Sequence, residues 1–324
     1  MTSRIARDFV YRKLLPYPRR IAAAATALKF YQRSGLAALA RGTGILRILG
    51  LQNQEKLLPR IDSNFFFSDL GKTYPAIGTP RARVAFFAGC VAQVTFSDLN
   101  RATIRVLQAN GCEVVVPAAQ TCCGALAAHA GIREVARDLA RQNFAAFNAD
   151  EFDAIINNAS GCGSMLKEYP LLFPSDAHEE ARARKFSTKV RDVNEFLADL
   201  GLTATLKTIS ARVTYQDSCH LVHGQKISEA PRKLIRAIPG IDFVEMPLSE
   251  QCCGSAGVYN VTENKTSLEL LDLKTESVKQ TRAQIIVTAN PGCILQLRAG
   301  AAIHKTGQEV LHVIELLDRA TQNS

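Results

Sequence analysis

The nine cysteines of this 324-residue chain are arranged as a repeat. Cys90, the triplet Cys122-Cys123-Gly124 and Cys162 recur as Cys219, Cys252-Cys253-Gly254 and Cys293, at offsets of 129, 130 and 131 residues. A fixed offset over four positions indicates that the chain contains the same module twice. The ninth cysteine, Cys112, aligns with the apolar Ile241, and we expect it to pack in a core and not to bind a ligand.

Short apolar runs alternate with helical periodicity from Arg83 onward, which is typical of β-α-β units and a parallel sheet. The predicted strands cover residues 84–87, 113–116, 154–156, 213–215, 243–246 and 285–288, and the predicted helices cover residues 97–110, 132–148, 228–238 and 267–281. Each repeated cysteine follows a predicted strand. The four cysteines of a module should therefore meet at the carboxyl edge of one sheet, where α/β proteins bind ligands.

The predicted fold class is α/β, with two pseudo-repeated parallel-sheet modules that face one another. We place the first module at residues 82–208 and the second at residues 209–324. Residues 1–81 are predicted to form a basic helical section and linker, interrupted at Tyr17-Pro18 and at several glycines.

Four converging thiolates suit either a zinc ion or an iron–sulfur cluster. The chain has no apolar secretory signal near its start, so we expect reduced thiols, and clustered reduced thiols usually hold metal. Structural zinc sites mostly use short Cys-x2–4-Cys pairs, which are absent here, whereas the adjacent Cys122-Cys123 pair can reach two irons of a larger cluster. The pattern favours iron–sulfur clusters, of the 4Fe-4S type and at most one per module. Zinc as a purely structural metal is the alternative.

Gly124 and Gly254 follow the adjacent cysteines at equivalent positions. We expect them to let the backbone approach the inorganic centre and to offer amide hydrogen bonds to its sulfur. The predicted ligands are the eight repeated cysteines: Cys90, Cys122, Cys123, Cys162, Cys219, Cys252, Cys253 and Cys293.

The formal net charge of +9 is concentrated near the start of the chain. Residues 1–60 hold twelve Lys and Arg side chains but only Asp8 and Glu55 as acids, so the remainder is close to neutral. This asymmetry predicts a basic surface that meets a partner chain, a membrane surface or a polyanion. No nucleic-acid recognition motif accompanies the charge, so we do not expect nucleic acid as the partner.

The longest apolar run of this basic section, Ile21 to Leu28, is far shorter than the ~20 residues of a membrane span. The composition of the basic section also resembles an organellar transit peptide, although the basic character continues to about residue 60. We expect a cytoplasmic protein that can lie at the inner membrane surface.

The cysteine pattern resembles the tandem CCG domain of heterodisulfide reductase and its relatives. It has Cys-x31-Cys-Cys-Gly-x37-Cys in the first module and Cys-x32-Cys-Cys-Gly-x38-Cys in the second. Within that superfamily, the flanks around Cys219, Cys252 and Cys293 are most similar to glycolate oxidase iron–sulfur subunits, and next to lactate-utilisation iron–sulfur proteins. The resemblance implies an electron-transfer subunit of an oxidoreductase complex, in which flavin-containing glycolate or lactate oxidase subunits oxidise the 2-hydroxy acid.

Two departures from the family pattern bear on the chemistry. The fuller motif has a fifth cysteine where this chain has Met165 and Gln296, which argues against heterodisulfide-cleaving chemistry. The ferredoxin motifs that usually precede the CCG domains are absent from this sequence, so either a separate ferredoxin-like chain carries those clusters or this chain is a shortened version of the subunit. The acceptor implied is a quinone or another redox partner.

Other candidates have plainer roles. His220 and His223 flank Cys219 and could be a ligand, a proton donor, or structural residues, and the structural role is favoured. Met165 is expected to pack in a core. The Phe65-Phe66-Phe67 triplet is either a partner-binding patch or an anchor for the linker.

Overall fold

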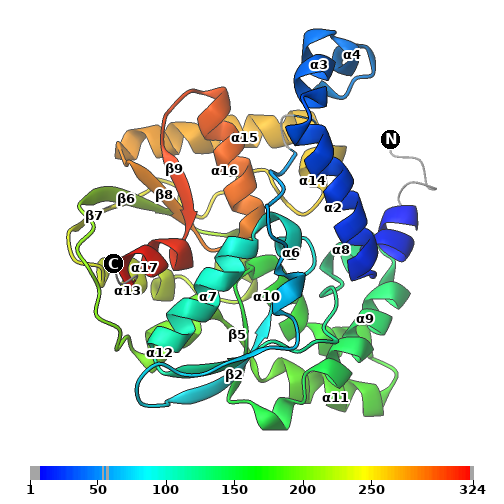
Figure 1. Cartoon of the computed structure of the whole chain (residues 1–324), viewed down its shortest axis with the longest axis vertical. Coiled ribbons are helices and arrows are strands. Elements are labelled where there is room, and N and C mark those ends of the chain that lie inside the picture. The colour runs from blue at the N-terminus through cyan, green and yellow to red at the C-terminus, as the bar shows by residue number, and fades with distance from the viewer. Residues whose placement is uncertain (1–7, 53–54, 56–57, 322–324) are drawn as a thin grey trace.

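Two sheets with matching topology form the body of the protein (Figure 1). This computed structural model describes residues 8–52, 55 and 58–321. The first sheet has the order β1-β3-β2-β4-β5 and the second β7-β6-β8-β9. Their strands are β1 Thr73–Tyr74, β2 Ala82–Phe87, β3 Cys112–Val115, β4 Ala154–Asn157, β5 Val190–Asp192, β6 Ala211–Gln216, β7 Ile241–Glu245, β8 Ile285–Thr288 and β9 Glu309–His312. All pairs are parallel except β1 with β3, so the predicted α/β class with a repeated parallel-sheet module is confirmed.

Helices connect and cover these strands. In the first module they are α6 Ala92–Thr95, α7 Ser97–Ala109, α8 Ala125–His129, α9 Arg133–Ala146, α10 Ser160–Lys167, α11 Ala177–Ser187 and α12 Val193–Leu200. In the second they are α13 Glu229–Arg236, α14 Tyr259–Thr262, α15 Asn264–Thr281, α16 Pro291–Ile303 and α17 Val313–Thr321. A strand, a cysteine-bearing turn and a helix therefore follow one another in both halves.

Strand β2 shows why the first sheet is buried on both faces. Val84 and Phe86 pack into one core, while Ala85 and Phe87 pack into another on the opposite face, as the two-residue period of a strand requires. The first of these cores continues into the second module through Val213 and its neighbours. The two modules thus share one hydrophobic core.

Helix–helix contacts also join the modules. α7 packs against α17, and α12 packs against α13. At the first contact, Arg105 makes two hydrogen bonds to the carboxylate of Asp318, at 3.0 and 2.6 Å. The modules face one another through these helices and through the turns that carry the cysteines.

Three short strands were not predicted. β5 and β9 complete the two sheets at equivalent edges, and β1 pairs with β3 from a segment that precedes residue 82. The linker thus contributes an edge strand to the first sheet. The boundaries proposed at residues 82 and 209 stay predictions.

The basic section is helical, with α2 Pro18–Arg33, α3 Leu36–Gly42 and α4 Ile45–Ile48. Helix α2 begins at Pro18, as a proline at the first helical turn permits, and packs through Ile21 and Ala25 against Ile61 and Val94. Helices α3 and α4 project from the body as a tip (Figure 1). None of the helices in the described part of the chain is both long and apolar enough to pass through a bilayer.

Candidate metal centre

A single cavity of about 250 Å³ lies where the carboxyl edges of the two sheets face each other. Its lining includes all eight repeated cysteines, together with the turns that follow β2, β3, β4, β6, β7 and β8. The structure therefore brings together the residues predicted as ligands, from both modules, around one space. That they bind metal stays a prediction.

The first quartet consists of Cys90, Cys122, Cys123 and Cys162. Cys90 follows β2, the adjacent pair precedes α8, and Cys162 lies in the first turn of α10. The Sγ atoms of Cys123 and Cys162 are 3.4 Å apart. A hydrogen bond with Cys122, together with burial, raises the pKa of Cys90 well above its usual value.

The second quartet, Cys219, Cys252, Cys253 and Cys293, is built in the same way from β6, β7 and α16. Hydrogen bonding to Cys252, followed by burial, raises the pKa of Cys219, while hydrogen bonds from Cys219 and Cys253 lower the pKa of Cys252. Asn290 donates its side-chain amide to Cys293 Sγ at 3.4 Å. Neighbouring thiols in both quartets are thus close enough to share protons.

Gly124 and Gly254 have the same conformation and the same contact. Both have positive φ, +83° and +89°, and each donates its backbone N–H to the Sγ atom two residues earlier, at 3.4 Å to Cys122 and 3.3 Å to Cys252. These amide contacts are made to cysteine sulfur; the predicted contacts to sulfur of the inorganic centre stay a prediction. A Cβ atom at Gly254 would lie 2.3 Å from the backbone oxygen of Ser267, so this turn lies directly on α15.

Neutral side chains make hydrogen bonds to the backbone around the first quartet. The Asn143 amide on α9 accepts a hydrogen bond from Thr121 N at 3.0 Å and donates to Cys122 O at 3.1 Å. Tyr169, which is fully buried, donates its hydroxyl to Cys123 O at 3.0 Å. Gln120 accepts a hydrogen bond from Ala88 N at 2.8 Å and so ties the end of β2 to the same loop.

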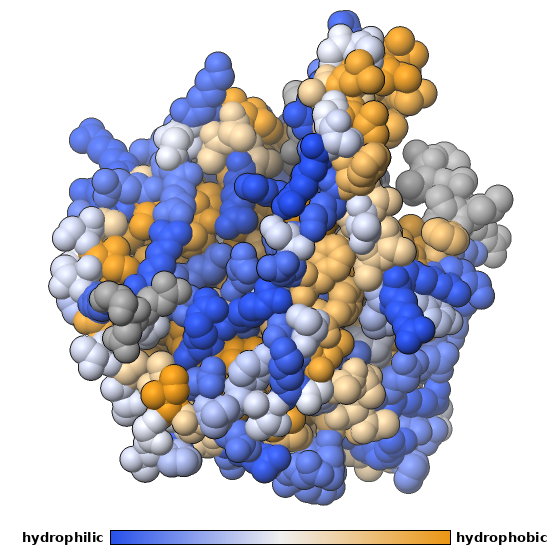
Figure 2. Space-filling view, viewed as in Figure 1, coloured by the Kyte–Doolittle hydropathy of each residue, from blue (hydrophilic) through white to orange (hydrophobic). Residues whose placement is uncertain are grey.

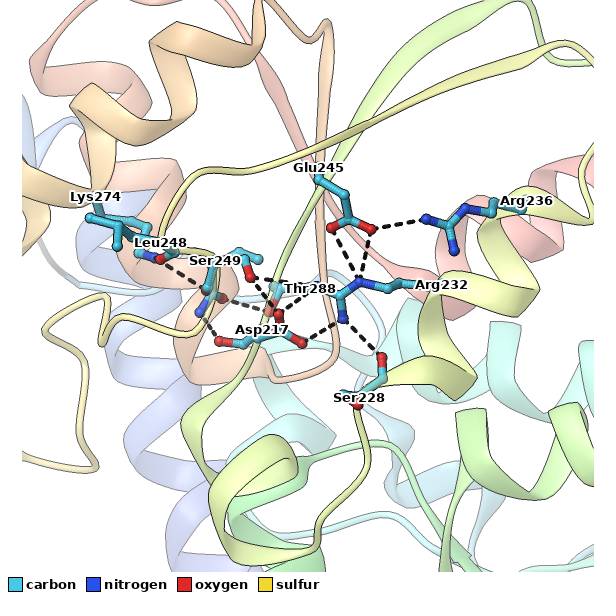
Figure 3. A network of polar contacts seen from close by, with 10 residues as sticks. Asp217, Ser228, Arg232, Arg236, Glu245, Leu248, Ser249, Lys274 and Thr288 are labelled. Carbon is cyan, nitrogen blue, oxygen red and sulfur yellow. Dashed lines mark hydrogen bonds and ion pairs between the residues drawn. The ribbon is translucent and has the colours of Figure 1, made fainter.

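Charged side chains form a polar network beside the loop that leads to the second quartet (Figure 3). Lys274 on α15 donates its ammonium to the backbone oxygens of Leu248 and Ser249, at 2.7 and 3.2 Å. Asp217 accepts two hydrogen bonds from Arg232, at 2.9 and 2.7 Å, and a third from the hydroxyl of Ser249 at 2.7 Å. These contacts hold the loop that leads from β7 to Cys252.

Two histidines from different modules meet at the cavity. The rings of His129 and His220 are stacked, with centroids 6.1 Å apart. His220 Nδ1 lies 3.7 Å from Cys219 Sγ, and burial, followed by the neighbouring His129, lowers the pKa of His220. His223 is exposed.

The remaining candidates are placed as follows. Cys112 is fully buried in the shared core, where burial raises its pKa to about 11. Met165 packs in the core on the other face of the first sheet, and Gln296 donates to Ser267 Oγ at 3.0 Å. Phe66 is buried against Phe86, with ring centroids 5.9 Å apart, so the phenylalanine triplet anchors the linker.

The residues at the site that were not predicted from the sequence include His129, Asn143, Tyr169 and Lys274. For His129 the sequence holds no signal, because it meets His220 only in the folded protein. Asn143 and Lys274 carry a signal in hindsight: they are 131 residues apart, which is the offset between Cys162 and Cys293. Comparing the modules outside the cysteines would have found this pair.

The donor set fits a sulfur-rich centre in each module. Four thiols converge, amide N–H groups point to sulfur, and the surroundings are largely apolar, as clusters held by cysteine require. Within the described residues, no group of three or more His, Cys, Asp or Glu side chains is arranged to hold one metal ion. The thiols of each quartet instead contact one another in a row.

Comparisons with known proteins agree with this construction. Two copies of a family described as "Cysteine-rich domain" match residues 84–167 and 213–298, and the family "Glycolate oxidase iron-sulfur subunit, linker region" matches residues 2–58. A crystal structure of a hypothetical protein from Helicobacter pylori superposes with a TM-score of 0.56 over 80% of this chain and 53% of that one. At 13% identity this similarity concerns the fold alone.

Three curated proteins illustrate the relationship. The probable glycolate oxidase iron-sulfur subunit of Bacillus subtilis is 40% identical over 97% of this chain and 72% of its own length. Lactate utilization protein A of Oceanobacillus iheyensis is 35% identical over 73% of this chain and 96% of its own length. A fumarate reductase (CoM/CoB) subunit of Methanothermobacter marburgensis is 34% identical over 74% of this chain and 47% of its own length. With its linker and both cysteine-rich domains matched, this chain belongs to the family of glycolate oxidase iron–sulfur subunits.

Proposed function

We propose that this chain is the electron-transfer subunit of a complex that oxidises glycolate to glyoxylate. Flavin-containing subunits would take the hydride from the 2-hydroxy acid, and this chain would pass single electrons toward a quinone or another acceptor. The observation that supports it most is the convergence of eight cysteines, in two equivalent quartets, on one cavity. Two redox centres that open onto one cavity suit electron transfer better than structural support.

Each quartet would hold one iron–sulfur cluster of the 4Fe-4S type, which supplies one-electron redox chemistry when bound. Cys90, Cys122, Cys123 and Cys162 would hold the first, and Cys219, Cys252, Cys253 and Cys293 the second. Gly124 and Gly254 keep their N–H groups against ligand sulfur, and such contacts stabilise the more negative, reduced state. The apolar lining of the cavity limits access of water.

Metal analysis tests the centre itself. After anaerobic purification we expect iron and acid-labile sulfide in the chain, with an EPR signal that appears on reduction. Zinc in stoichiometric amount without sulfide would make the quartets structural and end the electron-transfer proposal.

Cysteine variants test which residues are ligands. Cys122→Ser, Cys123→Ser, Cys252→Ser and Cys253→Ser are each expected to lower iron content, because each removes a thiolate from a quartet. Cys112→Ser is the matched control: this thiol is buried in the core and should leave iron unchanged. Equal iron loss in Cys112→Ser would contradict the division into two sets of four.

The substrate is tested with the flavin partner present. Glycolate is expected to reduce the iron–sulfur centres of the chain, and so to produce their EPR signal, faster than lactate does. The similarity to lactate utilization protein A makes lactate the competing substrate, and a preference for lactate would reassign the complex. A separate ferredoxin-like chain as a further partner would be detected by co-purification.

We also propose that the basic N-terminal section lies on the anionic inner surface of the membrane. The tip formed by α3 and α4 exposes Leu39, Ile48 and Leu49, and Figure 2 shows hydrophobic residues gathered there beside hydrophilic ones. An apolar tip that carries the exposed Arg47, with the exposed Arg33 at the end of α2 before it, matches the chemistry of a lipid interface.

A further inference from the structure

The polar residues beneath the two quartets differ in charge although the backbone around them is equivalent. Helix α9 begins at Arg133 and α15 at Asn264, an offset of 131 residues. Ala136 lies against Gly124 as Ser267 lies against Gly254, again at an offset of 131. Asn143 and Lys274 therefore occupy the same place on equivalent helices.

Both side chains have the same structural role. Each is 0% exposed and each bonds to the backbone of the loop that leads into the adjacent cysteines. Asn143 does this with a neutral amide and Lys274 with an ammonium. The hydrogen bonds are comparable, so the difference between the modules is a buried positive charge.

Neighbouring charges do not cancel that of Lys274. Asp217 is the nearest buried carboxylate in the network, but Arg232 makes two hydrogen bonds to it and neutralises it (Figure 3). Glu245 accepts hydrogen bonds from Arg232, at 3.0 and 3.2 Å, and from Arg236, at 2.9 Å, and it is half exposed and screened by solvent. The two guanidinium groups thus balance the two carboxylates, Asp217 and Glu245. The buried network of the second module thus carries one net positive charge, which no residue of the Gln120–Asn143–Tyr169 set supplies in the first.

The ammonium lies close to the second quartet, because it donates to the backbone oxygen of Ser249, three residues before Cys252, at 3.2 Å. Burial lowers the pKa of Lys274, while the charges of Cys253, Asp217, Cys252 and Cys293 act to raise it. A cluster held by four thiolates is more negative after reduction, so a nearby fixed cation stabilises the reduced state. Net charge and burial are among the properties by which proteins set cluster potentials.

We infer that Lys274 is a positioning and charge-tuning residue that gives the second centre a higher reduction potential than the first. This inference rests on the proposed iron–sulfur function. The two quartets are alike in ligands and amide contacts. A difference in their reduction potentials would therefore come from the residues packed behind them. One side chain then separates the potentials of two otherwise matched centres.

The test is an EPR-monitored redox titration of the anaerobically purified full chain, with iron and sulfide counted in each sample. In Lys274→Met we expect the midpoint of the second centre alone to fall. The expected size is about a tenfold decrease in its reduction equilibrium constant, which corresponds to about 59 mV for one electron. The second centre is identified as the signal that Cys293→Ser removes.

Three further variants separate charge from fit. Lys274→Gln keeps a hydrogen-bond donor without charge and should behave like Lys274→Met, whereas Lys274→Arg should keep the higher potential. Lys279→Met removes an exposed cation from the same helix, paired with Glu276 at 2.6 Å, and should change neither midpoint. If the uncharged variants lose the second centre while Lys274→Arg keeps it, the positive charge is still required.

Other results would overturn the inference. Equal shifts of both midpoints, or no shift in either, would show that the charge of Lys274 does not separate the two potentials. Loss of the second centre in all three Lys274 variants would show that the shape of the side chain and not its charge matters. Those outcomes leave the proposed function intact, since iron, sulfide and a reducible signal would still be present. Zinc without sulfide would instead remove the proposed function and this inference together.

Discussion

Asp192 and His312 occupy one position in the two modules, at the end of the edge strand and just before a helix. Each accepts a hydrogen bond from a backbone N–H two residues later, Asn194 N at 2.8 Å and Ile314 N at 3.1 Å. Both are fully buried. Burial raises the pKa of Asp192 to about 6 and lowers the pKa of His312 to about 4.

These two shifts act on stability with opposite signs in the same pH range. The native state favours protonated Asp192, so its stabilising contribution is complete below the unfolded-state pKa near 4 and is lost as pH rises through 6. The native state favours neutral His312, so its contribution is complete above pH 6.5 and is lost as pH falls through 4. Each amounts to about 3 kcal/mol, and the two nearly cancel.

We therefore predict that variants of either residue alone show a pH dependence of the free energy of unfolding that the two residues cancel in the wild type. Asp192→Asn keeps a capping oxygen but cannot ionise, so its free energy of unfolding should rise more steeply than the wild type's between pH 4 and 6. His312→Asn should show the reverse, a free energy that falls with pH in this interval. Urea unfolding of the apo chain followed by circular dichroism measures both. Parallel pH profiles for the two variants would contradict the assignment.

The turns that carry the adjacent cysteines depend on glycine for two reasons, and the chain offers a control that separates them. Gly254 has positive φ and no room for a Cβ atom, whereas Gly307 has positive φ, +74°, with nothing within 4 Å. Gly307→Ala should cost about 1–2 kcal/mol of stability through backbone strain alone.

Gly254→Ala should cost about 1–3 kcal/mol more, because the methyl group meets the backbone of α15 at Ser267. We also expect it to lower iron content, since the turn must move and carries Cys252 and Cys253 with it. Unfolding and iron analysis of both variants provide the check. Equal costs for the two substitutions would show that close packing at Gly254 is unimportant.

At the scale of elements, the cysteine repeat and the apolar runs were enough to predict the central strands and the helices α7, α9, α13 and α15, whereas α11 and α16 were not predicted. β2, β3 and β4 and their counterparts β6, β7 and β8 lie within three residues of their predicted bounds. β5 and β9 were missed because each runs directly into a helix, with no glycine or proline turn to mark the change. β1 was missed because two residues are too few to show the apolar–polar alternation of a strand. Only their pairing with β3 defines them as one.

The candidate site was predictable only in part for a similar reason. A repeated pattern identifies residues that two modules share, such as the cysteines and glycines. It is silent on residues that differ between them, such as Asn143 and Lys274, and on contacts across modules, such as His129 with His220. Those depend on which surfaces meet in three dimensions.

For the molecule as a whole, the projecting tip predicts lipid-dependent binding. The chain should co-sediment with vesicles that contain phosphatidylglycerol more than with phosphatidylcholine vesicles, and salt should weaken the difference. Ile48→Ser should reduce this binding, because Ile48 is 83% exposed at the tip, while Leu171→Ser, 65% exposed on the first module, should not. Binding that requires the flavin subunit in place of lipid would make the tip a subunit interface.

The shared cavity has a consequence for chemical damage. In each quartet two thiols are buried and two are partly exposed: Cys90 and Cys162 in the first, Cys219 and Cys252 in the second. Both pairs line the same opening. Oxygen or an alkylating reagent that enters from solvent therefore reaches the thiols of both quartets by one route, so chemical modification of one quartet is expected to accompany modification of the other.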